Sequence, residues 1–369
     1  MVASVIEGVR LAGVVSCVPE RRETVADLAA RFGDEAAQRI AKATGIEARH
    51  LVPPHQCTSD LAEAAARHLL DRLGWAADSV SLLILVSQTH DHVLPGTGLL
   101  LHRRLGLSKD AAVFDMGLGC SGYVYGLWTA AALLKACGGG RALLLAGDTT
   151  SRVLDPDDRA VAPLFGDAAS ATALEIDGAA EPMTFALGSD GAGAPYLMVP
   201  GGALRRPDEP AHLFMDGTQV FAFTLREVPG NIRAALDLAG WGMGDVDRVV
   251  MHQANAQMIR HLAQKIGAAP EQTVLALAGH GNTSSASIPL ALTEALAGEL
   301  TQRSYRLLLS GFGVGWSWGS AALSVGPLGV CATIVLDAAG HAAIPAERHP
   351  AEAAGPAKGA DDPAYSAGQ

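Results

Sequence analysis

A cysteine among glycines is the strongest candidate for chemistry in this sequence. Cys120 stands in a Gly-Cys-Ser-Gly stretch between an apolar run at 111–116 and a helix-like segment at 123–136. This arrangement predicts a strand-to-helix turn with the cysteine at the start of the helix, where unpaired N–H groups favour negative charge. Since the thiolate is the nucleophile, we expect a thiol that ionises readily. The alternative is an inert buried cysteine.

Three motifs in the second half of the chain add candidates of other types. His252 follows a short apolar run, and Asn282 stands in a Gly-Asn-Thr-Ser turn ahead of a helix-like segment. A glycine-dense turn at 311–315 could aim a backbone N–H at a developing oxyanion. Each of these could instead be a helix cap or a simple tight turn. Taken together with Cys120, however, they indicate a catalytic site.

A weak internal duplication would bring these residues together. Apolar runs alternate with helix-like segments along the chain, which predicts an α/β fold with covered sheets. In both halves an apolar run, a turn with a candidate residue, a helix and a Leu-rich run follow one another. If the halves pack about a pseudo-twofold axis, then Cys120, His252 and Asn282 converge. The alternative is chance similarity between Leu-rich strands.

Bulk properties argue against several classes of protein. The net charge of −11 argues against broad binding to nucleic acid or to an anionic membrane. The five cysteines are scattered and odd in number, and no C-x-x-C pair indicates a zinc ribbon or a disulfide framework. No signal peptide is visible, and the apolar runs are too short to span a bilayer. We therefore expect a protein of the reducing cytoplasm.

Two motifs resemble a cofactor site and a metal site, but both are incomplete. The Gly-x-Gly-x-x-Gly pattern at 117–122 resembles a dinucleotide fingerprint, but no acidic residue follows from 123 through 147. The His-Asp-His run at 90–92 lacks a third ligand at a telling spacing. The sequence therefore predicts no metal and no bound cofactor.

At this point the chain resembles a known family, the β-ketoacyl-acyl-carrier-protein synthases III. These thiolase-fold condensing enzymes start fatty-acid and some polyketide chains. The resemblance covers about Val5 to Val325 and rests on G-C-S-G, H-Q-A-N, G-N-T-S-S-A-S and G-F-G-x-G. It implies a five-layered αβαβα fold of two pseudo-duplicated halves, usually as a homodimer. We assign residues 1–175 and 176–330 to the halves and, from composition, 338–369 to a disordered tail.

The resemblance also implies a role for each candidate. Cys120 would attack an acyl thioester and hold the acyl group, which splits one difficult step into two. His252 and Asn282 would donate hydrogen bonds to the carbonyl of a malonyl thioester as CO₂ leaves. The N–H groups of Cys120 and Val314 would form the oxyanion hole. The neutral amide of Asn282 suits this step, because a carboxylate there would repel the developing negative charge.

The positions that contact the thioester carrier depart from the family pattern. Arg39 replaces the adenine-stacking Trp, and Gln257 replaces a basic residue that helps dock the acyl carrier protein. Leu94 falls where the dimer partner reaches into the acyl pocket. We therefore expect a role in specialised or secondary metabolism. The substrate-binding residues expected from the resemblance are Arg39, Leu94, Arg159, Asn255 and Phe312.

The sequence thus predicts a condensing enzyme. It would join an acyl starter, carried by coenzyme A or an acyl carrier protein, to a malonyl thioester by decarboxylative Claisen condensation. Because the positions that contact the thioester carrier are altered, an alternative function stays open. It is an acyltransferase that passes the acyl group from Cys120 to a hydroxyl, amine or carrier thiol, with His252 as base. A non-catalytic subunit is disfavoured by the intact set of three, and a papain-like protease by the alternating α/β pattern.

Overall fold

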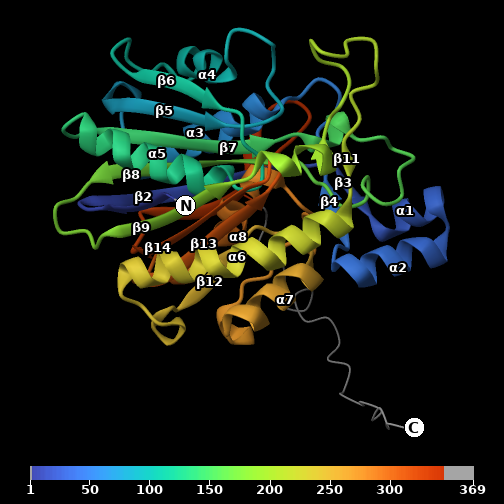
Figure 1. Cartoon of the computed structure of the whole chain (residues 1–369). Coiled ribbons are helices and arrows are strands. Elements are labelled where there is room, and N and C mark those ends of the chain that lie inside the picture. The colour runs from blue at the N-terminus through green and yellow to red at the C-terminus, as the bar shows by residue number, and fades with distance from the viewer. Residues whose placement is uncertain (1, 345–369) are drawn as a thin grey trace, which may run out of the picture.

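A mixed β-sheet of seven strands forms the first half of the framework (Figure 1). The computed structural model describes residues 2–344. The strands lie in the order β16-β15-β2-β8-β7-β5-β6. Their bounds are β2 (Val9–Pro19), β5 (Val80–Val86), β6 (Ala112–Met116), β7 (Arg141–Asp148), β8 (Ala168–Ile176), β15 (Val330–Leu336) and β16 (Ala342–Ala343).

A second sheet of five strands carries the other half, in the order β1-β9-β14-β13-β12. Its strands are β1 (Val2–Ile6), β9 (Met183–Ser189), β12 (Arg248–Met251), β13 (Tyr305–Gly313) and β14 (Ser317–Val325). The first strand of the chain therefore lies in the sheet built by the second half. Two short ribbons complete the strands: β3 (Arg22–Thr24) with β4 (Ala48–His50), and β10 (Leu197–Met198) with β11 (Phe214–Met215).

The two sheets repeat one topology. In the first, β2 pairs antiparallel with β8, β8 antiparallel with β7, and β7 parallel with β5. In the second, β9, β14, β13 and β12 follow in the same order with the same three directions. The predicted duplication is confirmed, because β5 corresponds to β12 and β7 to β13 as the sequence repeat requires.

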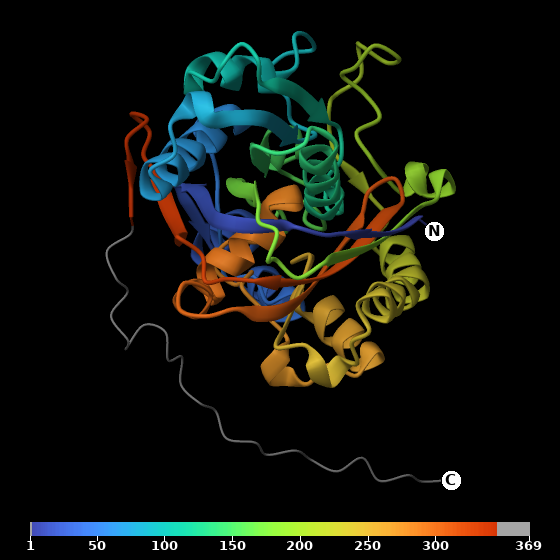
Figure 2. The ribbon, with the colours of Figure 1, turned by 90° about the vertical axis from the view of Figure 1, so that its left-hand side faces the viewer.

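Helices form three layers around these sheets. The helices are α1 (Val25–Phe32), α2 (Asp34–Thr44), α3 (Thr58–Leu73), α4 (Thr97–Leu105), α5 (Gly122–Ala136), α6 (Gly217–Ala239), α7 (Ala256–Ile266), α8 (Ser287–Ala295) and α9 (Ala297–Leu300). Helices α5 and α8 contact strands of both sheets and lie between them (Figure 2). Helices α3 and α4 cover the outer face of the first sheet, and α6 and α7 cover the second. This is the predicted five-layered αβαβα arrangement.

The central helix α5 explains how the nucleophile turn is held. It is apolar on most of its surface, which is the pattern of a helix buried on all sides. Leu127 is fully buried in the core cluster that joins the two sheets. At Gly126, an added Cβ would lie 2.6 Å from a Leu144 methyl and 2.8 Å from a Val86 methyl. The glycine therefore lets α5 approach the first sheet closely and fixes the turn that precedes it.

The predicted disordered tail is wrong for its first residues. Strand β15 pairs in parallel with β2, and β16 pairs with β15 through Val335 and Leu336. Residues 338–344 thus belong to a hairpin at the edge of the first sheet, whereas 345–369 lie outside the described residues. A strand as short as β16 is held by main-chain hydrogen bonds and needs no apolar pattern, so composition gave no sign of it.

We expect Leu127→Ala to lower the free energy of unfolding by about 2–5 kcal/mol, because it leaves a cavity between the two sheets. Leu238→Ala is the matched control, since Leu238 is 39% exposed on α6 and exposed substitutions usually cost below about 1 kcal/mol. Urea unfolding measures both values. Equal losses would contradict a central position for α5.

Candidate active site

Cys120 lies where two cavities meet. It stands two residues before α5 and is 8% exposed. The larger cavity, of about 550 Å³, is lined by apolar and small side chains together with Gln88, Thr89 and Asp148. The smaller, of about 70 Å³, continues on the other side of the cysteine. One sulfur can therefore serve two different ligands in turn.

The smaller cavity brings the three candidate catalytic residues together. His252 follows directly after β12, and Asn282 stands in the turn that leads toward α8. Both line this cavity with Cys120. The turns come from equivalent places in the two halves, so the pseudo-symmetry of the sheets creates the juxtaposition.

His252 is held as a neutral ring. Burial lowers the pKa of His252 to about 3, so the imidazole is uncharged at neutral pH. Its Nδ1 lies 2.6 Å from Oγ of Ser287, the backbone of Ser284 also hydrogen bonds to the ring, and the residue lines the smaller cavity. The ring of Phe312 meets it edge-on, with 5.7 Å between centroids. Phe312, expected to bind substrate, is 1% exposed and touches the histidine.

Asn282 is oriented by its own turn. Its Oδ1 accepts a hydrogen bond of 2.9 Å from the backbone N–H of Ser284. Its backbone N–H donates to the carbonyl of Leu164, and its carbonyl accepts from the N–H of Gly166, in a separate segment of the same chain. With the oxygen occupied, the NH₂ group is the free end of the carboxamide and can only donate. Asn282 caps neither the short 3₁₀ turn at 284–286 nor α8, so the alternative that this residue is a helix cap is wrong.

The expectation of a readily ionised thiol is wrong for the resting protein. Burial raises the pKa of the Cys120 thiol to about 12, and the negative charge of Asp148 acts in the same direction. Hydrogen bonds from Ser284 and from the backbone of Val314 and Cys120 oppose this shift but do not outweigh it. The cost of placing an unpaired anion in a dry site exceeds the effect of the helix start.

The backbone around the sulfur is nonetheless arranged for an anion. The backbone groups of Val314 and Cys120 hydrogen bond to the sulfur. A Cβ added at Gly313 would lie 2.9 Å from Sγ of Cys120. The glycine loop therefore runs directly against the nucleophile, where its N–H groups can reach a carbonyl oxygen bound there.

The remaining substrate-binding candidates are spread out. Asn255 lines the smaller cavity, but its side chain also caps α7 by accepting from Met258 N–H at 2.8 Å. Arg159 lies on an exposed loop with its guanidinium 5.6 Å from the ring of Phe32. The Arg39 side chain is 72% exposed and pairs with Glu35 on α2. Leu94 is 79% exposed. Within this chain, neither Arg39 nor Leu94 lines a cavity at Cys120.

Comparison with known proteins agrees with this geometry. Residues 114–191 match the family description 3-oxoacyl-[acyl-carrier-protein] synthase III, and residues 236–325 match its C-terminal part. A β-ketoacyl-[acyl-carrier-protein] synthase III of Streptomyces coelicolor is 37% identical over 326 residues, covering 85% of this chain and 96% of that protein. The chain belongs to the 3-oxoacyl-[acyl-carrier-protein] synthase III family. The family model ends at 325, so β15 and β16 follow the part that it matches.

Solved structures of the family share the fold. A 3-oxoacyl-(acyl-carrier protein) synthase from Burkholderia xenovorans is 40% identical with a TM-score of 0.88, covering 90% of this chain and 99% of that one. The priming β-ketosynthase of the R1128 polyketide pathway is 26% identical with a TM-score of 0.77, covering 87% and 97%.

Two polar residues on the larger cavity were not among the candidates predicted from the sequence. Asp148 ends β7 and is 1% exposed, and Ser284 lies two residues beyond Asn282. Both line the cavity at Cys120. A carboxylate that ends a fully apolar strand was the available signal for Asp148. The position of Ser284 depends on the fold of its turn and could not be read from spacing.

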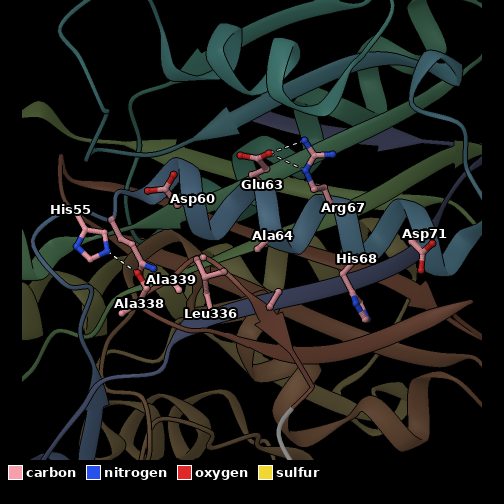
Figure 3. A pocket seen from close by; sticks show the side chains of 13 residues that line it. His55, Asp60, Glu63, Ala64, Arg67, His68, Asp71, Leu336, Ala338 and Ala339 are labelled. Atoms are coloured by element: carbon pink, nitrogen blue, oxygen red, sulfur yellow. Dashed lines mark hydrogen bonds and ion pairs between the residues drawn. The ribbon is translucent and has the colours of Figure 1, made fainter.

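Another cavity lies away from Cys120. It has a volume of about 600 Å³ and runs between α3 and the β15–β16 hairpin, where His55, Glu63 and Arg67 project into it (Figure 3). It contains none of the residues around Cys120. Within residues 2–344, no cluster of three His, Cys, Asp or Glu is arranged to hold a metal, and no helix is both long and apolar enough to cross a membrane.

We expect Gly313→Ala to reduce acylation of Cys120 by at least about 100-fold, since a misplaced reacting group costs this much. The added methyl would lie 2.7 Å from Cβ of Cys120 and displace the sulfur. Single-turnover intact-mass spectrometry with an acyl-CoA measures the rate. Gly279→Ala is the control, because its Cβ has only an ordinary contact of 3.7 Å with Arg22. Full activity of Gly313→Ala would contradict the close approach.

The neutral state of His252 predicts acid sensitivity. Its folded pKa of about 3 lies below the ordinary value of 6.5, so the folded state binds fewer protons in this window. Its contribution to stability is complete above pH 6.5 and declines as pH falls toward 3. The loss between pH 6.5 and 5 should be about 2 kcal/mol. Unfolding experiments at both pH values should show a smaller loss for His252→Gln. An equal loss would contradict the assignment.

Proposed function

We propose that this protein catalyses decarboxylative Claisen condensation of an acyl starter with a malonyl thioester through an acyl-Cys120 intermediate. The observation that carries the proposal is the meeting of Cys120, His252 and Asn282 on one small cavity. Membership of the 3-oxoacyl-[acyl-carrier-protein] synthase III family supports it. Coenzyme A and an acyl carrier protein would deliver the two thioesters, and the chemistry needs no metal or bound cofactor.

The first half-reaction would load the acyl group onto the sulfur. The larger cavity has the volume and the apolar lining to take an acyl chain, from walls that include Val153, Leu197 and Leu213. A thioester carbonyl at Cys120 would place its oxygen against the N–H groups of Cys120 and Val314. These fixed dipoles stabilise the tetrahedral oxyanion without reorganising as charge develops.

The second half-reaction would use the smaller cavity. In the tautomer that this step uses, Nδ1 of His252 accepts from Ser287, at 2.6 Å, and Nε2 carries the hydrogen that is donated to the malonyl thioester carbonyl. The NH₂ of Asn282 donates beside it, because its oxygen is held by Ser284. The two donors stabilise the enolate left by loss of CO₂, which then attacks the acyl carbonyl on Cys120.

We further propose that the active species is a homodimer. The edge of the first sheet at β6 has no partner strand within residues 2–344, and Phe114 on it is 37% exposed. The side chains of Val93 and Leu94, in the segment between β5 and α4, are 88% and 79% exposed. Pairing of two copies along β6 would cover these side chains and carry Leu94 to the acyl cavity of the partner.

A specialised pathway in the cytoplasm is the setting that we propose. Arg39 and Gln257 alter the carrier-binding rim, and an R1128 polyketide priming β-ketosynthase shares the fold at 26% identity. The five thiols are all free, as in a reducing compartment.

Separate assays of the two half-reactions test the proposal. We expect Cys120→Ala to form no acyl-enzyme by intact mass. His252→Ala and Asn282→Ala should still be acylated but lose CO₂ release and ketoacyl product by at least about 100-fold, since each removes a donor to the developing oxyanion. Cys137→Ala removes an exposed thiol and serves as the matched control.

Two outcomes would contradict the condensation. One is the absence of CO₂ and ketoacyl product from the wild type across a broad panel of starters and malonyl carriers. The other is acyl transfer from Cys120 to a hydroxyl, amine or carrier thiol without malonyl, which would instead establish the acyltransferase.

A further inference from the structure

A buried carboxylate stands beside the nucleophile without a cationic partner. Asp148 is 1% exposed, and the described residues form no ion pair with it. Its oxygens accept from neutral donors: Gln88 N–H at 2.7 Å, Ser285 hydroxyl at 2.7 Å, Ser285 N–H at 3.2 Å, Ser87 hydroxyl at 3.3 Å and Thr89 hydroxyl at 3.5 Å. Burying such a charge is costly, so a structural role alone is a weak reason for it.

Ser284 connects this carboxylate to the sulfur. Ser284, Cys120 and Asp148 all line the larger cavity, and hydrogen bonding from the Ser284 side chain lowers the pKa of both the thiol and the carboxyl group against the effect of burial. Among residues 2–344 Ser284 is the only non-glycine residue with a positive φ, of 51°. Such backbone strain is concentrated at functional sites. The strained turn therefore puts one hydroxyl between a thiol and a carboxylate.

The acylation step needs a proton acceptor that the other candidates do not supply. The pKa of the Cys120 thiol is about 12, so at neutral pH the sulfur carries its proton when the thioester arrives. The pKa of His252 is about 3, and the residue lines the smaller cavity, where the proposed second half-reaction uses it as a donor. Burial raises the pKa of Asp148, which makes its carboxylate a better base than an exposed one.

We propose that Ser284 and Asp148 form the proton path by which Cys120 is activated for acylation. As Sγ forms its bond to the acyl carbon, its proton passes to Oγ of Ser284, and the hydroxyl proton of Ser284 passes to the Asp148 carboxylate. When the bond between the acyl carbon and the carrier sulfur breaks, the departing thiolate takes the proton back by the same route. Asp148 is then a carboxylate again, and no net proton is consumed.

This inference rests on the proposed function, since it assigns the base for its first half-reaction. The titratable groups that line the two cavities at Cys120 are Asp148 and His252. A pH profile of acylation therefore separates them. The path predicts a rate that rises as Asp148 ionises and stays level once it is ionised.

Ser284→Gly is the most informative variant. Glycine adopts the φ of 51° without strain, so the fold should be kept while the hydroxyl is lost. We expect single-turnover acylation at pH 7 to fall by at least about 100-fold, the usual size of a general-base effect. The rate should then rise tenfold per pH unit through pH 9, because solvent must remove the proton. Intact mass with an acyl-CoA measures it.

Asp148→Asn separates a base from a mere neighbouring charge. If the carboxylate only repels the thiolate, removing it lowers the thiol pKa and acylation becomes faster. If it accepts the proton, acylation at pH 7 becomes at least about 100-fold slower. Thr283→Val is the matched control, since it removes an adjacent buried hydroxyl that has no partner. It should leave the rate within twofold of the wild type.

Three results have different meanings. Ser284→Gly that is acylated at the wild-type rate at pH 7 would overturn the proton path, as would acylation lost in His252→Ala but kept in Ser284→Gly. Ser284→Gly that is acylated no faster at pH 9 than at pH 7 would also overturn it, because the loss would then not lie in removal of the thiol proton. If the wild type itself is never acylated, it is the proposed function that fails.

Discussion

Desolvation of one sulfur is the constraint on which the site depends. Cys120 is enclosed where the two halves meet, and burial keeps its thiol protonated in the resting protein. The same enclosure strengthens every dipole aimed at a bound thioester, because charges interact more strongly inside a protein than in bulk water. In the function that we propose, such a site is unreactive until a substrate and a proton acceptor are both present. That separation protects a nucleophile that would otherwise react with any electrophile.

The duplicated fold explains how residues from distant parts of the chain converge on that sulfur. Equivalent strands of the two halves end at the centre of the molecule. The Cys120 turn lies between β6 and α5, His252 follows β12, and Asn282 precedes α8. The pseudo-twofold relation places these turns face to face. In the proposed function the halves differ in role, since one turn carries the nucleophile and the other carries hydrogen-bond donors.

The residue Ser284 shows how closely the functions are connected. Its N–H fixes the Asn282 carboxamide, its backbone bonds to the His252 ring, and its side chain faces Cys120 and Asp148. One strained turn thus contacts Asn282 and His252 on the smaller cavity and lines the larger cavity beside Asp148. This shared anchor requires the two cavities to keep a fixed relation to the sulfur, as two successive reactions on it demand.

The sequence by itself determined the fold class, the duplication and the choice of Cys120, His252 and Asn282, because these depend on local periodicity and on motifs carried by short segments. It misjudged the thiol, since a helix start is a local feature whereas desolvation is set by every residue that surrounds the sulfur. It also missed Asp148, Ser284 and the β15–β16 hairpin. The strained backbone of Ser284, the place of Asp148 beside the sulfur and the two-residue strand β16 produce no recognisable spacing of residue types in the sequence. Only tertiary structure decided which polar groups share one dry cavity, because that depends on contacts between segments that are far apart in sequence.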